Sequence, residues 1–418
     1  MQSEEHPLTA AEDAVQPTSA PKAIADSVAA AEAAVPPAST PISAPVSTPI
    51  SMPISAPIST PIEPGRIEKL AARVFVGEDG LRSGWSILLF SVLMLIVSGI
   101  AGAFLLGLHL IDPKQPTGLR SMFCGELIQL LGIVAAAAAV ALIEHRKGNL
   151  LAYNLMGPRR AQRFAVGVVC GFAALSALIG ALKAGGLIAL AGSGLAAPQI
   201  LEYAALWGLT FLLVGSVEEG LVRCYLQSTL TRGINLWWAL GWQATMCGFV
   251  AWRVKGVSGW GVYAMTLLGL APCIWLHLKK AESAGFWQAA WVGSTFFGLM
   301  HTGNGGENWI GIFAAAAIGF VFCASIYVTG SAWWAIGFHA AWDWAETFFY
   351  GTADSGLPAQ GSLLVAKPAG NVLWSGGADG PEGSLLVLAV ILLTLLALAA
   401  FYKMQRAESC AQKTESSF

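Results

Sequence analysis

The chain has 418 residues, of which 55% are hydrophobic and only 11% charged, and its mean hydropathy is +0.62. Soluble globular domains carry about 25% charged residues, so this composition excludes an ordinary soluble domain and predicts an all-α, polytopic integral membrane helical bundle. The formal net charge of −2 gives no reason to expect nucleic acid as a partner; the expected surroundings are a lipid bilayer.

Residues 1–64 form a distinct N-terminal tail, rich in Ala, Ser, Thr and Pro and without aromatic residues. A proline recurs at every fourth position from Pro41 to Pro61. Proline at this density prevents helix formation and removes hydrogen-bond donors from a sheet. We therefore predict a disordered tail or spacer.

Residues 65–150 comprise a basic juxtamembrane segment and the first two predicted transmembrane helices. The first long apolar run begins only near Trp85, so we expect the first spanning helix, rather than a cleaved signal peptide, to direct the chain to the membrane. The seven cysteines are scattered and have no metal-ligand spacing, and they predict no disulfide framework.

Apolar runs approach or reach the 20 or so residues that a crossing needs at ten places. They lie near 85–110, 125–143, 164–190, 204–229, 236–252, 258–276, 285–303, 309–329, 332–350 and 384–402. The runs 236–252 and 258–276 are the weakest, so we expect eight to ten transmembrane helices. Residues 351–383 are predicted to form a loop, 384–402 the final helix and 403–418 a cytoplasmic tail.

The distribution of Lys and Arg over the short loops predicts the orientation in the cell membrane. It favours an even number of crossings with both termini in the cytoplasm.

Three ionisable clusters lie in or beside these apolar runs: Glu218-Glu219 with Arg223, Phe297 with His301, and His339 with Asp343. A charged side chain near the bilayer centre costs on the order of +3 kcal/mol on insertion scales, so such residues usually line a functional cavity. Carboxylates and histidines are also the groups that activate water.

Spacing divides the roles within the first cluster. Glu219 and Arg223 are four residues apart on one helix face and can form an ion pair, whereas Glu218 points about 100° away and is left free. One neutralised carboxylate beside one free carboxylate suits acid–base chemistry. The alternative is a buried ion pair that only sets helix packing.

The sequence around the two histidines gives different support for a functional role. His301 lies near a helix end that is followed by glycines, and a lone histidine of this kind is more often a core residue than a ligand. His339 and Asp343 are four residues apart, so the carboxylate can orient the imidazole, or the two can ligate a metal together.

The ordered motifs Glu-Glu-x-x-x-Arg, Phe-x-x-x-His and His-x-x-x-Asp resemble the CPBP intramembrane proteases. That family joins the type II CAAX prenyl endopeptidases with bacteriocin-processing and related bacterial proteins. The basic loop Met-Gly-Pro-Arg-Arg at 156–160 is also similar to its members. The resemblance covers roughly residues 150–350 and assigns 151–350 as a CPBP-like protease core. It implies hydrolysis of a peptide bond by an activated water, without a covalent intermediate.

The resemblance also implies individual roles. Glu218 is the general base that polarises the water, and Glu219 and Arg223 support it. His301 and His339 orient the water or ligate a divalent metal. The implied substrate is a membrane protein or a lipidated peptide, which the sequence does not narrow further.

Asp343 departs from the family pattern, because the eukaryotic CAAX enzymes have at this position an Asn thought to stabilise the oxyanion. An ionised Asp cannot donate that hydrogen bond, so Asp343 must be protonated, ligate a metal or orient His339. This departure favours a metal site of His301, His339 and Asp343, with zinc as the expected ion. A metal-independent glutamate mechanism stays open.

A second departure is the 73 residues between Arg223 and Phe297, which predict an inserted hairpin around 240–280.

Other function classes fit parts of the pattern. A non-catalytic partner-binding or immunity protein could retain the fold, and intramembrane Glu, His and Asp also suit a proton-coupled transporter. The segment 256–259 matches the GxSG of rhomboid serine proteases, and paired histidines occur in haem and quinone sites. The intact trio favours the protease.

Overall fold

The computed structural model describes residues 74–77, 80–112, 114, 118–144, 148–253, 259–280, 283–358 and 360–415. The predicted tail (1–64), most of the basic juxtamembrane residues and most of the GxSG segment lie outside these ranges.

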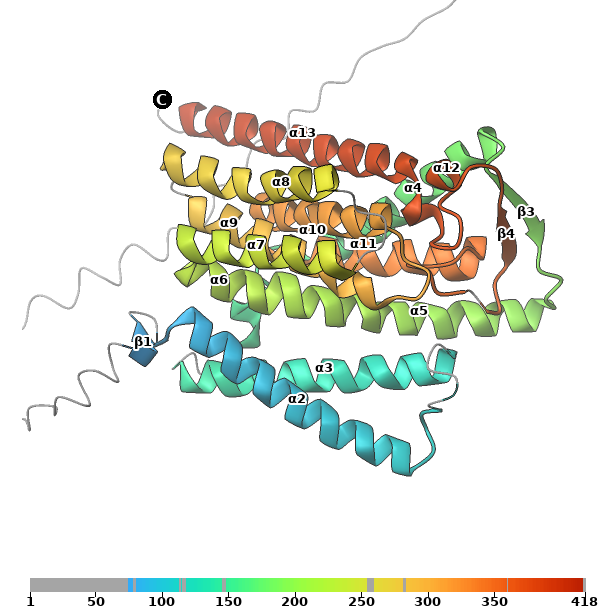
Figure 1. Cartoon of the computed structure of the whole chain (residues 1–418), viewed down its shortest axis with the longest axis horizontal. Coiled ribbons are helices and arrows are strands. Elements are labelled where there is room, and N and C mark those ends of the chain that lie inside the picture. Colours follow the sequence, from blue (N-terminus) through green and yellow to red (C-terminus); the bar gives the residue numbers. More distant parts are fainter. Residues whose placement is uncertain are drawn as a thin grey trace, which may run out of the picture. The chain divides into compact units, whose positions relative to one another are not determined.

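The described chain is built mainly of long helices (Figure 1). They are α2 (Ser83–Gly107), α3 (Leu119–Ile143), α4 (Arg160–Ala184), α5 (Ala197–Glu219), α6 (Gln227–Gly233), α7 (Leu236–Arg253), α8 (Gly259–Lys279), α9 (Ala284–Met300), α10 (Trp309–Thr329), α11 (Trp333–Trp344) and α13 (Leu385–Glu415). Shorter helical segments are η1 (Leu150–Ala152), η2 (Gly220–Leu226), η3 (His301–Gly303), η4 (Ala345–Tyr350), α12 (Val372–Ser375) and η5 (Pro381–Gly383).

Six helical segments of the described chain are long and apolar enough to cross a membrane. They are Ser83–Gly107, Leu119–Ile143, Arg160–Ala184, Ala197–Gly233, Trp309–Thr329 and Leu385–Glu408. The prediction of an all-α, polytopic membrane protein is therefore confirmed. Helices α7, α8, α9 and α11 are not among the six, so the count of eight to ten crossings stays a prediction.

Two small antiparallel sheets accompany the helices. β1 (Val76–Gly77) pairs with β2 (Gly80–Leu81), and β3 (Ile188–Gly192) pairs with β4 (Leu364–Pro368). The second sheet corrects two expectations, because the apolar run 164–190 ends in a strand and the loop 351–383 contains one. Helix α4 stops at Gly185-Gly186, where Gly186 has a φ of +68°, and the following residues continue as a strand.

The predicted hairpin around 240–280 is the helix pair α7 and α8, which packs against α9. Polar side chains join the three helices within this packing. Gln243 Nε2 donates to Thr295 Oγ1 at 2.9 Å, and Trp291 Nε1 donates to the Gly269 carbonyl at 2.9 Å. The pair therefore contacts the helix that carries Phe297.

Helix α4 closely approaches α11, the helix that carries His339 and Asp343. A Cβ at Gly167 would collide with the Trp334 carbonyl oxygen, and one at Gly171 would collide with the Phe338 carbonyl oxygen. Small residues four apart let two membrane helices approach at backbone distance. The position of α11 therefore depends on glycine in α4.

Gly171→Val should destabilise the protein by about 1–3 kcal/mol, because the added side chain must push α11 away. The matched control is Gly180→Val on the same helix, where a Cβ meets nothing within 4 Å. Thermal unfolding of the purified proteins in detergent measures the difference. Equal midpoints for the two variants would show that α4 and α11 do not need this approach.

Candidate active site

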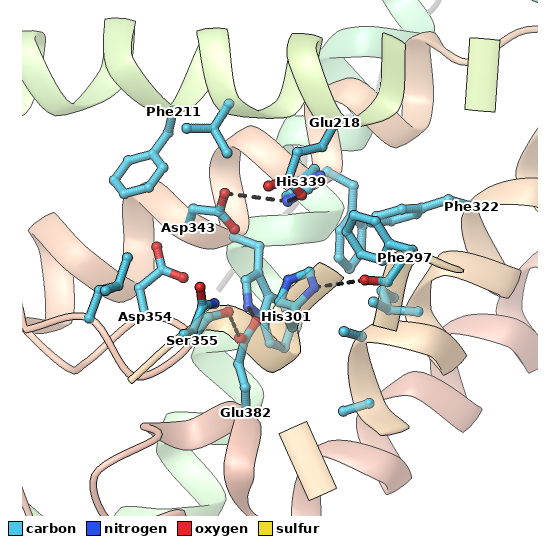
Figure 2. A pocket seen from close by; sticks show the side chains of 18 of the residues that line it. Phe211, Glu218, Phe297, His301, Phe322, His339, Asp343, Asp354, Ser355 and Glu382 are labelled. Atoms are coloured by element: carbon cyan, nitrogen blue, oxygen red, sulfur yellow. Dashed lines mark hydrogen bonds and ion pairs between the residues drawn. The ribbon is translucent and has the colours of Figure 1, made fainter. Parts of the chain in front are cut away.

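Several of the described helical elements contribute polar side chains to one cavity of about 240 Å³ (Figure 2). Four of the predicted site residues line it: Glu218 at the end of α5, His301 in η3, and His339 and Asp343 in α11. The three motifs are thus brought together. Glu219 and Arg223 do not line the cavity and lie fully buried behind it.

The two adjacent glutamates have different surroundings. Glu219 Oε2 lies 3.3 Å from Arg223 Nε, and Glu219 Oε1 accepts a hydrogen bond from His339 Nδ1 at 2.9 Å. Glu218 Oε2 lies 3.7 Å from His339 Nε2, and the side chain of Glu218 remains 25% exposed. The pairing inferred from spacing is present, and Glu218 is the glutamate with access to the cavity.

Arg223 is held by aromatic rings as well as by Glu219. Its guanidinium carbon lies 4.0 Å from the centroid of the Phe297 ring and 5.4 Å from that of Phe322, distances typical of cation–π contacts. Gly319 makes room for the guanidinium, because a Cβ there would collide with Nη2. This charge therefore lies between α5, α9 and α10.

The phenylalanine of the second motif is a contact shared by both histidines. The Phe297 ring centroid lies 4.8 Å from that of His301 and 6.0 Å from that of His339, each in an edge-on arrangement. Phe297 is itself buried. The aromatic ring of the Phe-x-x-x-His motif thus contacts both imidazoles.

His301 is oriented by the backbone. Its Nδ1 lies 2.9 Å from the Phe297 carbonyl oxygen, which can only accept, so Nδ1 carries the proton. In the neutral ring Nε2 then keeps its lone pair and can accept a proton or ligate a metal. Helix α9 ends at Met300, and the short helical turn η3 (His301–Gly303), which begins with His301, follows it directly.

His339 lies among three carboxylates. Nδ1 donates to Glu219, and Nε2 is 3.4 Å from Asp343 Oδ2 and 3.7 Å from Glu218 Oε2. Both ring nitrogens therefore face carboxylate oxygens. Asp343 is buried and, of the alternatives raised by its departure from the family pattern, this geometry corresponds to orienting His339.

The first and third motifs are each followed by a widened helical turn. The π-helical segment η2 begins directly after Glu219, and a second one, η4, begins two residues after Asp343. Such segments are rare in general but frequent at functional sites. They change the angular position of the residues on either side.

Sequence reasoning missed several acidic residues at or beside the cavity. Glu126, Asp354 and Glu382 line it, and buried Glu346 lies beside it. Glu126 and Glu346 fall within apolar runs, so the rule that singled out Glu218 could have found them. Asp354 and Glu382 lie in the 351–383 loop, where a charged residue is ordinary and gives no signal.

Burial raises the pKa of several carboxyl groups in the loops beside the cavity. Burial, reinforced by Asp379 and Glu382, raises the pKa of Glu307 from 4.5 to about 9. Burial and then Glu382 raise the pKa of Asp354 from 3.8 to about 8. Burial also raises the pKa of Asp379 to about 7, against the hydrogen bond from the Asn308 N–H. Glu307 therefore holds a proton at neutral pH.

The metal ligands predicted from sequence were His301, His339 and Asp343. In the part of the chain that the structure describes, one set of three donor side chains has its ligand atoms within 4.8 Å of one another, namely Glu346, Asp354 and Glu382. The predicted set is not assembled in this way. A zinc ion at the histidines therefore stays a prediction.

Comparison with known proteins gives one family. Residues 273–345 match the family model described as Type II CAAX prenyl endopeptidase Rce1-like. No curated protein and no solved structure shows significant similarity to the chain. The matched region contains the second and third motifs, with Phe297, His301, His339 and Asp343, but not the Glu-Glu motif at 218–219. The resemblance indicated by the motifs is thus confirmed: residues 273–345 of this multi-pass membrane protein are similar to the Rce1-like type II CAAX prenyl endopeptidases.

Proposed function

We propose that this protein is an intramembrane endopeptidase that hydrolyses a peptide bond with a water activated by Glu218. The observation that carries the proposal is the contrast between the two neighbouring glutamates. Glu219 is buried against Arg223, whereas Glu218 is half-buried, reaches the cavity and has His339 Nε2 at 3.7 Å. A carboxylate beside a cavity and within reach of an imidazole suits general-base catalysis.

In the proposed reaction Glu218 removes a proton from a water that attacks the scissile carbonyl. The proton then passes to the leaving amine, so no covalent intermediate forms. His339 orients Glu218 and the water, and it is held in place by Glu219. His301 presents Nε2, the nitrogen left free by its hydrogen bond to the Phe297 carbonyl.

The oxyanion of the tetrahedral intermediate needs hydrogen-bond donors, and Asp343 can supply one only in its protonated form. Asn304 lines the same cavity one turn after His301, and its amide Nδ2 makes only a long contact, 3.5 Å, to Glu307 Oε2. We assign the oxyanion contact to Asn304, in place of the Asn that the family carries at the position of Asp343.

The proposed substrate is a membrane protein or a lipidated peptide, of which a prenylated peptide is the form suggested by the family match. Apolar side chains from several helices share the cavity wall with the polar groups, which suits a chain segment that arrives from the bilayer. They are Phe211, Val214, Phe297, Ile318, Phe322 and Ile391. In the proposed topology both termini lie in the cytoplasm, which labelling of single-cysteine variants from either side tests.

Zinc held by His301, His339 and Asp343 is the alternative way to activate the water. Bound there, it would lower the pKa of a water ligand and polarise the scissile carbonyl. These three donors are not assembled in the described geometry, so the proposed water activation depends on Glu218 and His339.

Glu218→Gln should lower kcat by about 10²–10⁴-fold, because it removes the base and keeps the shape. His301→Ala should also abolish most cleavage. The matched control is Glu202→Gln, an isosteric change at an exposed position of the same helix α5. Cleavage of membrane-embedded and prenylated peptides by purified protein measures the effect. If Glu218→Gln and Glu202→Gln cleave at the same rate, the proposed function is wrong.

Asn304→Ala should lower kcat by about 10²–10³-fold and change KM by less than about threefold, since an oxyanion donor acts in the transition state. Asn371→Ala, which removes the cap of α12, serves as the control and should keep wild-type kinetics. A rise in KM with kcat unchanged would instead give Asn304 a role in substrate binding.

Removal of zinc should leave cleavage within about twofold of its starting rate, because Glu218 and His339 provide the proposed proton transfers. Phenanthroline treatment followed by elemental analysis and an activity assay tests this. Loss of activity that added Zn²⁺ restores, with bound zinc absent from His301→Ala, would support the zinc alternative.

A further inference from the structure

Three carboxylates that the proposed reaction does not use meet at the edge of the cavity. Glu346 belongs to η4, Asp354 to the bend after it, and Glu382 to the turn η5 before α13. One carboxylate oxygen from each lies within 4.8 Å of the others. Figure 2 shows Asp354 and Glu382 at the same side of the cavity as Ser355.

Glu346 is the unusual member of this carboxylate cluster. Its side chain is fully buried, and neither of its oxygens has a hydrogen-bond partner among the described residues. A buried, unpaired carboxyl group is strongly destabilising if it is charged. Glu346 therefore needs a compensating partner that none of the described side chains supplies.

The other two carboxylates have only neutral partners. Asp354 Oδ2 accepts from Thr347 Oγ1 at 3.2 Å. Glu382 accepts from Trp342 Nε1 at 2.7 Å and from Ser355 Oγ at 2.8 Å. Among the described residues, no Lys, Arg or His forms an ion pair with any of the three. The hydrogen bonds fix the directions of the two carboxylates without neutralising them.

The backbone around Glu346 is closely packed. The N–H and Oγ1 of Thr352 donate to the Glu346 carbonyl at 3.0 and 3.1 Å, which folds the bend back onto the helix. Gly380 has a φ of +99°, and a Cβ there would collide with the Ala353 carbonyl oxygen and lie 3.4 Å from Glu346 Oε1. Only glycine fits this approach. The oxygens of Glu346 thus face a confined space walled by two loops.

We propose that Glu346, Asp354 and Glu382 bind one hard divalent cation of the Mg²⁺, Mn²⁺ or Ca²⁺ class. An all-oxygen, carboxylate-rich donor set is the one these ions prefer, and it differs from the histidine-containing set preferred by zinc. The cation compensates Glu346 and joins the 351–384 segment to the helix that carries Asp343. This cation site is separate from the water-activating residues. The bound cation holds one wall of the cavity in place.

Titration of the purified full chain with Mn²⁺, followed by the EPR signal of the free ion, tests the proposal. Wild type should bind one Mn²⁺ per chain, and Ca²⁺ or Mg²⁺ should compete and raise the unfolding temperature. Glu346→Gln and Asp354→Asn should each weaken Mn²⁺ binding by about tenfold or more. Two controls should bind as wild type does: His301→Ala, and Glu307→Gln, which changes a nearby acid outside the cluster.

If Glu346→Gln fails to fold, Asp354→Asn still tests the proposal, because Asp354 is only half-buried. Absence of saturable Mn²⁺ binding in wild type, or unchanged binding in Asp354→Asn, would overturn the proposal. Binding lost in His301→Ala and kept in Asp354→Asn would also overturn it, since the ion would then belong to the histidines. Because the readout needs no substrate, its failure is distinguishable from failure of the protease proposal.

Discussion

The candidate site depends on one buried ion pair, that between Glu219 and Arg223. Both side chains are fully buried, where an unpaired charge would be strongly destabilising. Arg223 is in turn covered by the rings of Phe297 and Phe322, and Glu219 also accepts the hydrogen bond of His339. A single pair of charges thereby joins α5, α9, α10 and α11, and it fixes the imidazole that faces Glu218.

Local spacing was sufficient to predict this pair. Four-residue separations place Glu219 beside Arg223 and His339 beside Asp343 on any regular helix, so the sequence alone could assign Glu218 the free position. The long apolar helices were equally accessible, because hydropathy reports them directly. The order of the motifs could indicate convergence, but the mutual distances of the three helices come only from packing.

What the sequence could not indicate depends on contacts between distant segments. The pairing of Ile188–Gly192 with Leu364–Pro368 joins residues about 175 positions apart, and neither segment has a strong strand pattern. Asp354 and Glu382 become candidate metal ligands only because the same loop brings them close to Glu346. Glu346 itself was accessible to the rule for intramembrane charges, and it was missed because it stands outside any motif.

The widened turn η2 lies between the two glutamates of α5 and the chain that follows Leu226, and it sets the angle between these two segments. Successive residues of a regular helix differ by about 100° in direction, and one extra residue in a turn shifts the two flanking segments by the same angle. Downstream of η2 the register is held by Gln227, which donates to the Phe286 carbonyl at 3.0 Å. Tightening η2 to an ordinary helical turn would rotate the segment that carries Glu218 and Glu219 by about 100° relative to the segment that begins at Gln227. The direction in which the carboxylates of Glu218 and Glu219 point relative to the following helix thus depends on backbone winding as well as on their positions in the sequence.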